Sequence, residues 1–247
     1  MNVYKIGGNE LSNPRFLSRL ADEIAQLGEP TVIVHGGGKA IADLQAELGL
    51  EAVKVDGLRV TDAKSLQVAE MVLSGHANKL IVRALLATGV QAIGISGVDG
   101  GLLRCQKKGH PTADLGFVGQ IVEVNTRLIE HLMDGGLTAV LSPISLGLDG
   151  QSYNVNADEA AMAIANALNA KLLTFISNVP GVLQNEQLIP TLTIQQTETL
   201  IANGIITDGM VPKVRAALDA VTQGVAQARI VNLDGLMGSG GTYFAAV

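Results

Sequence analysis

Continuous apolar runs alternate with helix-like segments along the whole chain. The runs are unbroken by polar positions, which is typical of strands buried on both faces of a sheet. They lie at residues 31–38, 90–97, 137–145, 171–181 and 228–235. Between them apolar residues recur at the spacing of one helical face, as at Ile41, Leu44 and Leu48.

The first predicted helix opens at residues 12–14 and closes near Gly28, and the others follow the strands in turn. These further helices are expected at residues 39–50, 65–87, 125–136, 158–170 and 211–224. Residues 102–123 are polar and rich in turn formers, so we expect a hairpin there. The alternation predicts βαβ units, and therefore an α/β fold with a largely parallel sheet covered by helices on both faces.

Size and charge narrow the class of protein. A chain of 247 residues suits one large α/β domain or two closely joined lobes. The formal net charge of −6 argues against nucleic acid or an anionic membrane as the main partner. Cys105 is the single cysteine of the sequence, which allows a reducing, cytoplasmic setting. We also expect no membrane partner, because no apolar run approaches the length of a membrane span.

Glycines follow the predicted ends of three strands. Lys5 precedes Gly7 and Gly8, His35 precedes three glycines, and residues 177–181 read SNVPG. Ligands of parallel sheets bind beyond the carboxyl ends of the strands. A glycine-rich turn between a strand and a helix exposes N–H groups to anions, although an ordinary structural turn explains HGGGKA equally well. The P-loop pattern GxxxxGK[ST] does not occur, and GxGxxG does not follow the first strand.

Several polar residues lie in apolar surroundings. Asp158 precedes an alanine-rich helix and is either a helix N-cap or a functional carboxylate. Arg59 lies between apolar neighbours, where a structural salt bridge is the alternative to ligand binding, and Asp62 is expected at a helix entry. Lys213 lies near a helix start, a position that the helix dipole disfavours for a cation. The four histidines show no metal spacing, so we expect no protein-bound zinc.

Taken in order, five segments of the chain closely resemble the amino acid kinase family. They are KIGGN, VIVHGGGKAI, GLRVTD, NVNADEAA and GIITDGMVPKV, and the resemblance runs from residue 4 to about residue 242. It implies a three-layer αβα sandwich around a central, mainly parallel, eight-stranded sheet. The single domain would have an acyl-amino-acid-binding and dimerisation lobe at approximately 1–150 and an ATP-binding lobe at approximately 151–247.

Within the family, GLRVTD and NVNADEAA resemble the branch that phosphorylates the side-chain carboxylate of N-acetylglutamate with ATP, the second step of arginine biosynthesis. The resemblance implies that Lys5 and Lys213 offset charge on the transferred group and that Asp158 holds both lysines through ion pairs. Mg²⁺ would bridge the nucleotide phosphates. The acyl amino acid would be bound by Gly37, Gly38, Arg59 and Asn154, and the phosphates by Gly7, Gly8 and Gly36. The nucleotide would contact Ser177, Asn178, Val179, Gly181, Val182, Leu183, Thr207, Asp208, Gly209 and Met210.

Two other functions remain open from the sequence. SNVPG and GVDGGLL resemble a sister branch of lysine biosynthesis that phosphorylates aminoadipate or glutamate attached to an acidic carrier protein. Such a carrier requires a basic patch, and KKGH at residues 107–110 is the compact one in the sequence. A non-catalytic, amino-acid-binding regulatory protein is the second alternative, and the presence of Lys5, Asp158 and Lys213 argues against it.

We expect a homodimer. The unusually apolar segment 65–87 is a candidate for its two-fold interface, with burial inside one subunit as the alternative. Arginine-inhibited family members carry an additional N-terminal helix that links dimers into a hexameric ring. Only Met1 to Tyr4 precede Lys5, so the sequence predicts that arginine does not inhibit this chain.

Overall fold

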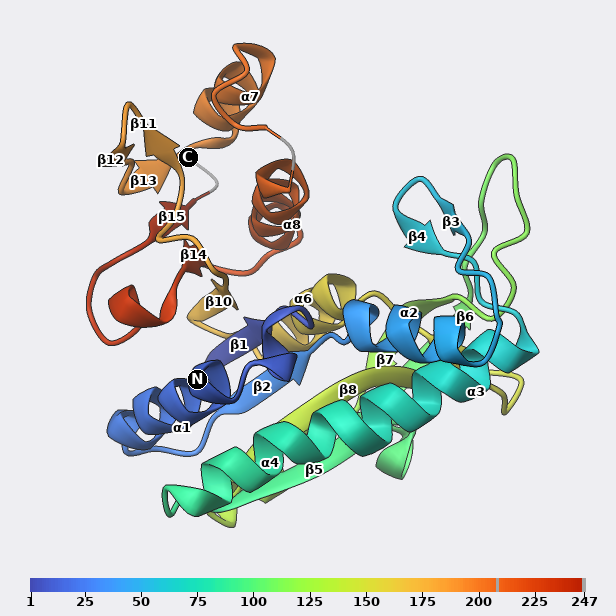
Figure 1. The fold of residues 1–247 in the computed structure, drawn as a ribbon. Helices are drawn as coiled ribbons and strands as arrows, with labels where there is room; N and C mark the ends of the chain where they lie inside the picture. The colour runs from blue at the N-terminus through green and yellow to red at the C-terminus, as the bar shows by residue number, and fades with distance from the viewer. Residues whose placement is uncertain (208, 246–247) are drawn as a thin grey trace.

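The computed structural model describes residues 1–207 and 209–245, which form a sheet between two layers of helices (Figure 1). Within these residues eleven strands join in one sheet, in the order β13-β15-β14-β10-β1-β2-β8-β6-β7, with β5 and β9 also paired to β8. The strands are β1 (Asn2–Ile6), β2 (Val32–His35), β5 (Ala92–Gly97), β6 (Leu103–Lys107), β7 (Gly119–Val124), β8 (Thr138–Gly147), β9 (Ser152–Asn154), β10 (Leu172–Ile176), β13 (Thr191–Leu192), β14 (Ala228–Val231) and β15 (Thr242–Phe244).

The expected mainly parallel sheet is confirmed. β1 lies between β2 and β10 and is parallel to both, while β6–β7, β8–β9 and β14–β15 are antiparallel. The predicted hairpin at residues 102–123 is therefore β6–β7. The expected count of eight strands is wrong for the described residues, because β9, β13 and β15, with 3, 2 and 3 residues, extend the sheet.

Helices cover the two faces of the sheet. They are α1 (Pro14–Leu27), α2 (Gly38–Glu47), α3 (Ala63–Glu70), α4 (Asn78–Ala87), α5 (Thr126–Asp134), α6 (Ala157–Ala167), α7 (Ile194–Ala202) and α8 (Met210–Thr222). One face packs α1 and α4 against Ile6 and Ile33, and the other packs α5, α6 and α8 against Val3 and Val34. Side chains of a strand point alternately to the two faces, which is why Val3 and Ile6 enter different cores. Within the described residues no helix is long and apolar enough to cross a bilayer.

The helix expected at residues 65–87 is α3 and α4 joined through a π-helical segment, Met71–Ala77. Ile81 and Leu85 of this helix are fully buried in the subunit, as the alternative interpretation of its apolar sequence required. Met71 and Leu86 are exposed. The helix therefore supplies a core face and also a few solvent-facing apolar side chains.

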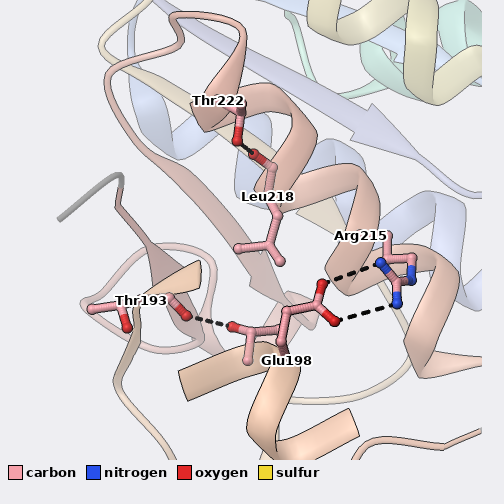
Figure 2. A network of polar contacts seen from close by, with 6 residues as sticks. Thr193, Glu198, Arg215, Leu218 and Thr222 are labelled. Carbon is pink, nitrogen blue, oxygen red and sulfur yellow. Dashed lines mark hydrogen bonds and ion pairs between the residues drawn. The ribbon is translucent and has the colours of Figure 1, made fainter. Parts of the chain in front are cut away.

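Polar contacts join α7 to α8 (Figure 2). Arg215 of α8 donates from Nη1 and Nη2 to the two carboxylate oxygens of Glu198, at 3.1 and 3.4 Å. Thr193 caps α7 and forms a capping box with Gln196. The Arg215–Glu198 pair thus links α7 to α8, whose first turn carries Lys213.

Two short hairpins lie outside the sheet. β3 (Lys54–Val55) pairs with β4 (Leu58–Arg59), and β11 (Leu183–Gln184) pairs with β12 (Gln187–Leu188). The first one stands beside a loop at residues 108–118 (Figure 1). It carries one of the candidate site residues, Arg59.

Candidate active site

The carboxyl ends of three neighbouring strands bring the glycine-rich segments together. Ile6, the last residue of β1, is in register with His35 of β2 and with Ile176 of β10. The chain segments that follow, at residues 7–8, 36–38 and 177–178, therefore leave the sheet side by side. This edge is the place where parallel α/β sheets bind ligands.

Lys5 forms an ion pair with Asp158 at this edge. Lys5 Nζ lies 2.7 Å from Asp158 Oδ1, and the two side chains are 16% and 32% exposed. The N-cap interpretation of Asp158 is wrong, because Asn156 is the N-cap of α6 and accepts the Asp158 N–H at 2.7 Å. The carboxylate of Asp158 is thereby left to hold the Lys5 ammonium.

Lys213 approaches the same region from α8. Its Nζ donates to Ser177 Oγ at 2.7 Å and to Asn178 Oδ1 at 3.3 Å. The expected ion pair with Asp158 is absent from the contacts of the described residues, because Lys213 is held by the segment after β10 instead. Burial lowers the pKa of Lys213 below its ordinary value, and the nearby charge of Lys5 lowers it further. An anion bound between the two lysines would relieve this repulsion.

A cavity of about 270 Å³ opens beside the Lys5–Asp158 pair. This volume is close to the lower limit of about 300 Å³ for small-molecule sites, which suits a small metabolite. The amino-terminal ends of α2 and α6 both reach it, and helix amino termini favour anions. The lining includes Lys5, Gly8, Gly36, Gly37, Gly38, Ile41, Lys54, Gly57, Leu58, Arg59, Leu73, Val118, Pro143, Asn154, Val155, Asn156, Ala157 and Asp158.

Arg59 is a cation without an acidic partner in the described part of the chain. Its guanidinium donates to Gln45 Oε1 and, at 3.0 Å, to the Gly38 carbonyl. No Asp or Glu carboxylate lies within salt-bridge distance of it, so the structural salt bridge considered from the sequence is not formed among residues 1–207 and 209–245. Asn154, across the cavity lining, donates to Thr61 Oγ1 at 3.3 Å. Asp62 caps α3, as expected.

Lys54 also lines the cavity, although it was not among the residues predicted from the sequence. Lys54 pairs with Arg59 across the β3–β4 hairpin, so the two cations belong to one small element. The turn between them is Asp56-Gly57, with φ of 48° and 80°. An Asp-Gly pair is a strong signal for a two-residue hairpin, and it could have placed Lys54 opposite Arg59.

The first two glycine-rich segments pack directly on one another. A Cβ on Gly8 would lie 2.4 Å from the Gly37 amide nitrogen and 2.9 Å from the Gly36 carbonyl carbon. Gly7 and Gly38 face open space instead. Gly8 is therefore required by packing between the loops, while Gly7 and Gly38 have room for a side chain.

His35 is buried beneath these glycines. Its Nδ1 lies 3.0 Å from the Gly36 carbonyl oxygen and its Nε2 lies 3.2 Å from Asn78 Nδ2. A carbonyl oxygen only accepts, so Nδ1 carries the proton and Nε2 accepts from Asn78. Burial lowers the pKa of His35 to about 4, which keeps the ring neutral.

Comparison with known proteins identifies the family of the chain. The model of the amino acid kinase family matches residues 1–232. The chain belongs to the amino acid kinase family. It is 50% identical over 238 residues to an acetylglutamate kinase of Roseiflexus castenholzii, covering 96% of this chain and 92% of that one. It is 44% identical over 250 residues to an acetylglutamate kinase of Methanopyrus kandleri, covering 98% and 99%. A crystal structure from Streptococcus mutans superimposes with a TM-score of 0.83 at 32% identity, covering 100% and 98%.

The described residues that are expected at the nucleotide of this amino acid kinase do not line the 270 Å³ cavity. Ser177 and Asn178 contact Lys213, and Gly209 and Met210 begin α8. Val182 contributes no exposed group, because its side chain is buried and its N–H is donated to Thr242 Oγ1 at 2.8 Å. Gly181 has a φ of 145°, and Leu183 is exposed in β11. Val179 and Thr207 lie in the connecting segments, and Asp208 lies outside the described residues.

The kinase fold offers no cage for a metal ion in the part of the chain that the structure describes. No group of three or more His, Cys, Asp or Glu side chains gathers there. Mg²⁺ usually keeps several waters and binds through substrate phosphates and one or two carboxylates. The donor set of this site therefore does not fit a metal held by the protein alone.

Proposed function

We propose that the chain transfers the γ-phosphoryl group of ATP to the side-chain carboxylate of N-acetyl-L-glutamate, giving N-acetylglutamyl 5-phosphate. The observation that carries the proposal is a small cavity that joins the Arg59 guanidinium, which has no carboxylate partner among the described residues, to the Lys5–Asp158 pair. N-acetylglutamate has two carboxylates, and a guanidinium binds one of them through charge-assisted hydrogen bonds. The relatives named acetylglutamate kinase support this substrate and a place in arginine biosynthesis.

The proposed mechanism is alignment and charge compensation. The acceptor carboxylate is ionised at neutral pH, so no general base is needed. Lys5 and Lys213 offset the negative charge of the transferred group, and the open backbone at Gly7 offers an amide to its oxygens. Asp158 holds the Lys5 ammonium in place. Mg²⁺ would enter with the ATP phosphates and neutralise part of their charge.

The basic segment KKGH at residues 107–110, which the carrier-protein alternative requires as a docking patch, is paired with acidic side chains in the structure. Lys107 pairs with Asp114 at 2.8 Å, Lys108 with Glu159 at 2.5 Å, and His110 lies 3.0 Å from an Asp56 carboxylate oxygen. The basic side chains of KKGH are thus already matched by carboxylates of this chain. An acidic carrier would have to displace these contacts, which favours the free amino acid as substrate.

The test is ATP turnover with a panel of acceptors, scored as acyl phosphate trapped by hydroxylamine. We expect turnover with N-acetylglutamate, and little with free glutamate, N-acetylaspartate or glutamate attached to a carrier peptide. Preference for the carrier-linked acceptor would support the sister branch. Absence of turnover with every acceptor, in protein that binds N-acetylglutamate, would support the non-catalytic alternative.

We further propose a cytoplasmic homodimer with two functional lobes. The order of the sheet supports the lobes, since β10, β13, β14 and β15 lie on one side of β1 and the remaining strands on the other. The exposed Met71 and Leu86 support a two-fold contact through the helix at residues 63–87. Light scattering of the wild type and of Met71→Glu tests the dimer, and a monomeric wild type would refute it.

A further inference from the structure

The β3–β4 hairpin is too small to hold its own shape. It consists of two residue pairs, Lys54–Arg59 and Val55–Leu58, closed by the Asp56-Gly57 turn. An isolated two-stranded hairpin is marginal in water even when it is longer. Its geometry matters because both of its cations, Lys54 and Arg59, line the cavity. Something outside the hairpin must therefore fix where these cations lie.

The base of the hairpin is attached to the loop at residues 108–118. The Thr61 N–H donates to the Leu115 carbonyl at 2.9 Å, and the Phe117 N–H donates to the Thr61 carbonyl at 2.7 Å. Asn154 supports the same point through Thr61 Oγ1. These bonds are made by Thr61, two residues after Arg59, and therefore fix the base of the hairpin. They do not hold its tip at Asp56-Gly57.

The tip is held by one contact between side chains. His110 Nε2 lies 3.0 Å from Asp56 Oδ2, and Figure 1 shows the loop rising beside the hairpin. The Thr112 N–H points at His110 Nδ1 from 3.4 Å, and an amide N–H only donates. Nδ1 is therefore the acceptor, and Nε2 carries the proton that is donated to Asp56. The His110 side chain is 9% exposed, so the loop fixes its ring, whereas the Asp56 side chain is 82% exposed.

We propose that His110 and Asp56 are positioning residues that hold the β3–β4 hairpin over the acyl-amino-acid cavity, so that Arg59 and Lys54 face the substrate. The proposal rests on the proposed function for the identity of that substrate. Arg59 follows the tip by three residues, and its guanidinium is itself bonded to Gln45 Oε1 and to the Gly38 carbonyl. Without a contact at the tip, the turn at Asp56-Gly57 and the backbone that carries Lys54 would still be free to move. The His110–Asp56 bond removes this freedom before the substrate arrives, which lowers the ordering cost of binding.

Kinetics of a double-mutant cycle test the role. His110→Ala and Asp56→Gly each remove the bond, and glycine suits the positive φ of position 56. Each should raise KM for N-acetylglutamate by about tenfold, the order expected for a hydrogen bond to a charged group. KM for ATP and kcat should stay unchanged. KM for N-acetylglutamate should be no higher in the double variant than in either single variant, because both substitutions remove the same bond. Asp56→Asn retains an acceptor oxygen and should recover most of the loss.

Lys107→Ala is the matched control, because it breaks an ion pair between the end of β6 and Asp114 of the same loop without touching the hairpin. It should leave both KM values at the wild-type level. The proposal would be overturned if the rises in KM of the two single variants multiplied in the double variant. It would also be overturned if the variants lost kcat with no rise in KM.

Amide hydrogen exchange of the free enzyme separates this proposal from the proposed function. The amides of Val55 and Leu58, which pair next to the Asp56-Gly57 turn, report the opening of the hairpin tip. We expect their exchange to be about tenfold faster in His110→Ala and unchanged in Lys107→Ala. Unchanged exchange in His110→Ala refutes the positioning role whatever the substrate is. Failure of the wild type to phosphorylate N-acetylglutamate refutes the proposed function alone.

Discussion

Gly8→Ala should separate the two glycine-rich loops that define the phosphoryl-transfer edge. The added Cβ would stand 2.4 Å from the Gly37 nitrogen, whereas ordinary van der Waals contact begins at 3.4 Å. Because the obstructing atoms belong to the backbone, no rotamer change relieves the clash, and the loops must part by about 1 Å. A misplacement of that size costs on the order of 100-fold in rate. The overpacking costs about 1–3 kcal/mol, or roughly 2–12 °C in Tm.

Turnover with saturating ATP and N-acetylglutamate, and Tm by calorimetry, measure the two effects. Gly238→Ala is the control for both, because its Cβ would meet nothing within 4 Å. Gly7→Ala also adds a Cβ into open space and should keep the wild-type Tm. A Gly8→Ala enzyme with wild-type Tm and turnover would show that the loops do not need their close approach.

Five further substitutions test individual residues. Lys5→Ala should lower kcat on the order of 100-fold with little change in binding of N-acetylglutamate, measured by kinetics and calorimetry; near-normal kcat would exclude its role in charge compensation. Arg59→Ala should raise KM for N-acetylglutamate by about tenfold or more and leave KM for ATP unchanged; equal damage to both constants would make Arg59 structural. Asp158→Asn should lower kcat with little change in Tm, whereas Asn156→Ala should lower the unfolding free energy by about 1 kcal/mol because α6 loses its N-cap. A loss of stability in Asp158→Asn with normal kcat would show that Asp158 is the structural residue instead. Because the pKa of His35 is lowered to about 4 in the folded state, the unfolded state binds its proton first. The unfolding free energy should therefore fall by about 3 kcal/mol as pH drops from about 6.5 to about 4. Urea titrations at several pH values should show that the unfolding free energy of His35→Gln depends less on pH than that of the wild type. An equal pH dependence in the two proteins would refute the lowered pKa of His35.

The apolar pattern predicted the central elements because buried parallel strands are continuous in sequence. The predicted strand at residues 137–145 is β8 (Thr138–Gly147), and the predicted helix at residues 211–224 is α8 (Met210–Thr222). α7, with the sequence IQQTETLIA, was not predicted, and its one fully buried side chain is the polar Thr197. Its capping box, Thr193 with Gln196, is a local signal that was available. The π-helical segment at Met71–Ala77 has no signal that we can identify in the sequence.

The candidate site was predictable where its residues follow strand ends, as Lys5 and Gly37 do. The choice between Asn156 and Asp158 as the cap of α6 was not, since both side chains suit an N-cap and only the backbone conformation at Asn156 decides. Lys54 was not predicted as a site residue, because a lysine in a polar segment gives no sign of function on its own. Only the hairpin places it opposite Arg59. The His110–Asp56 contact joins residues 54 positions apart, which no local pattern encodes.

The central position of β1 has a consequence for how the chain folds. β1 is made first, yet one of its edges pairs with β10 (Leu172–Ile176), which lies about 170 positions later. A nascent chain that ends before β10 leaves that edge unpaired, with N–H and C=O groups free to recruit another strand. Contacts this distant in sequence slow folding and prolong the lifetime of such intermediates. The strand that carries Lys5 is thus also the strand whose exposure during synthesis carries the greatest risk of misassembly.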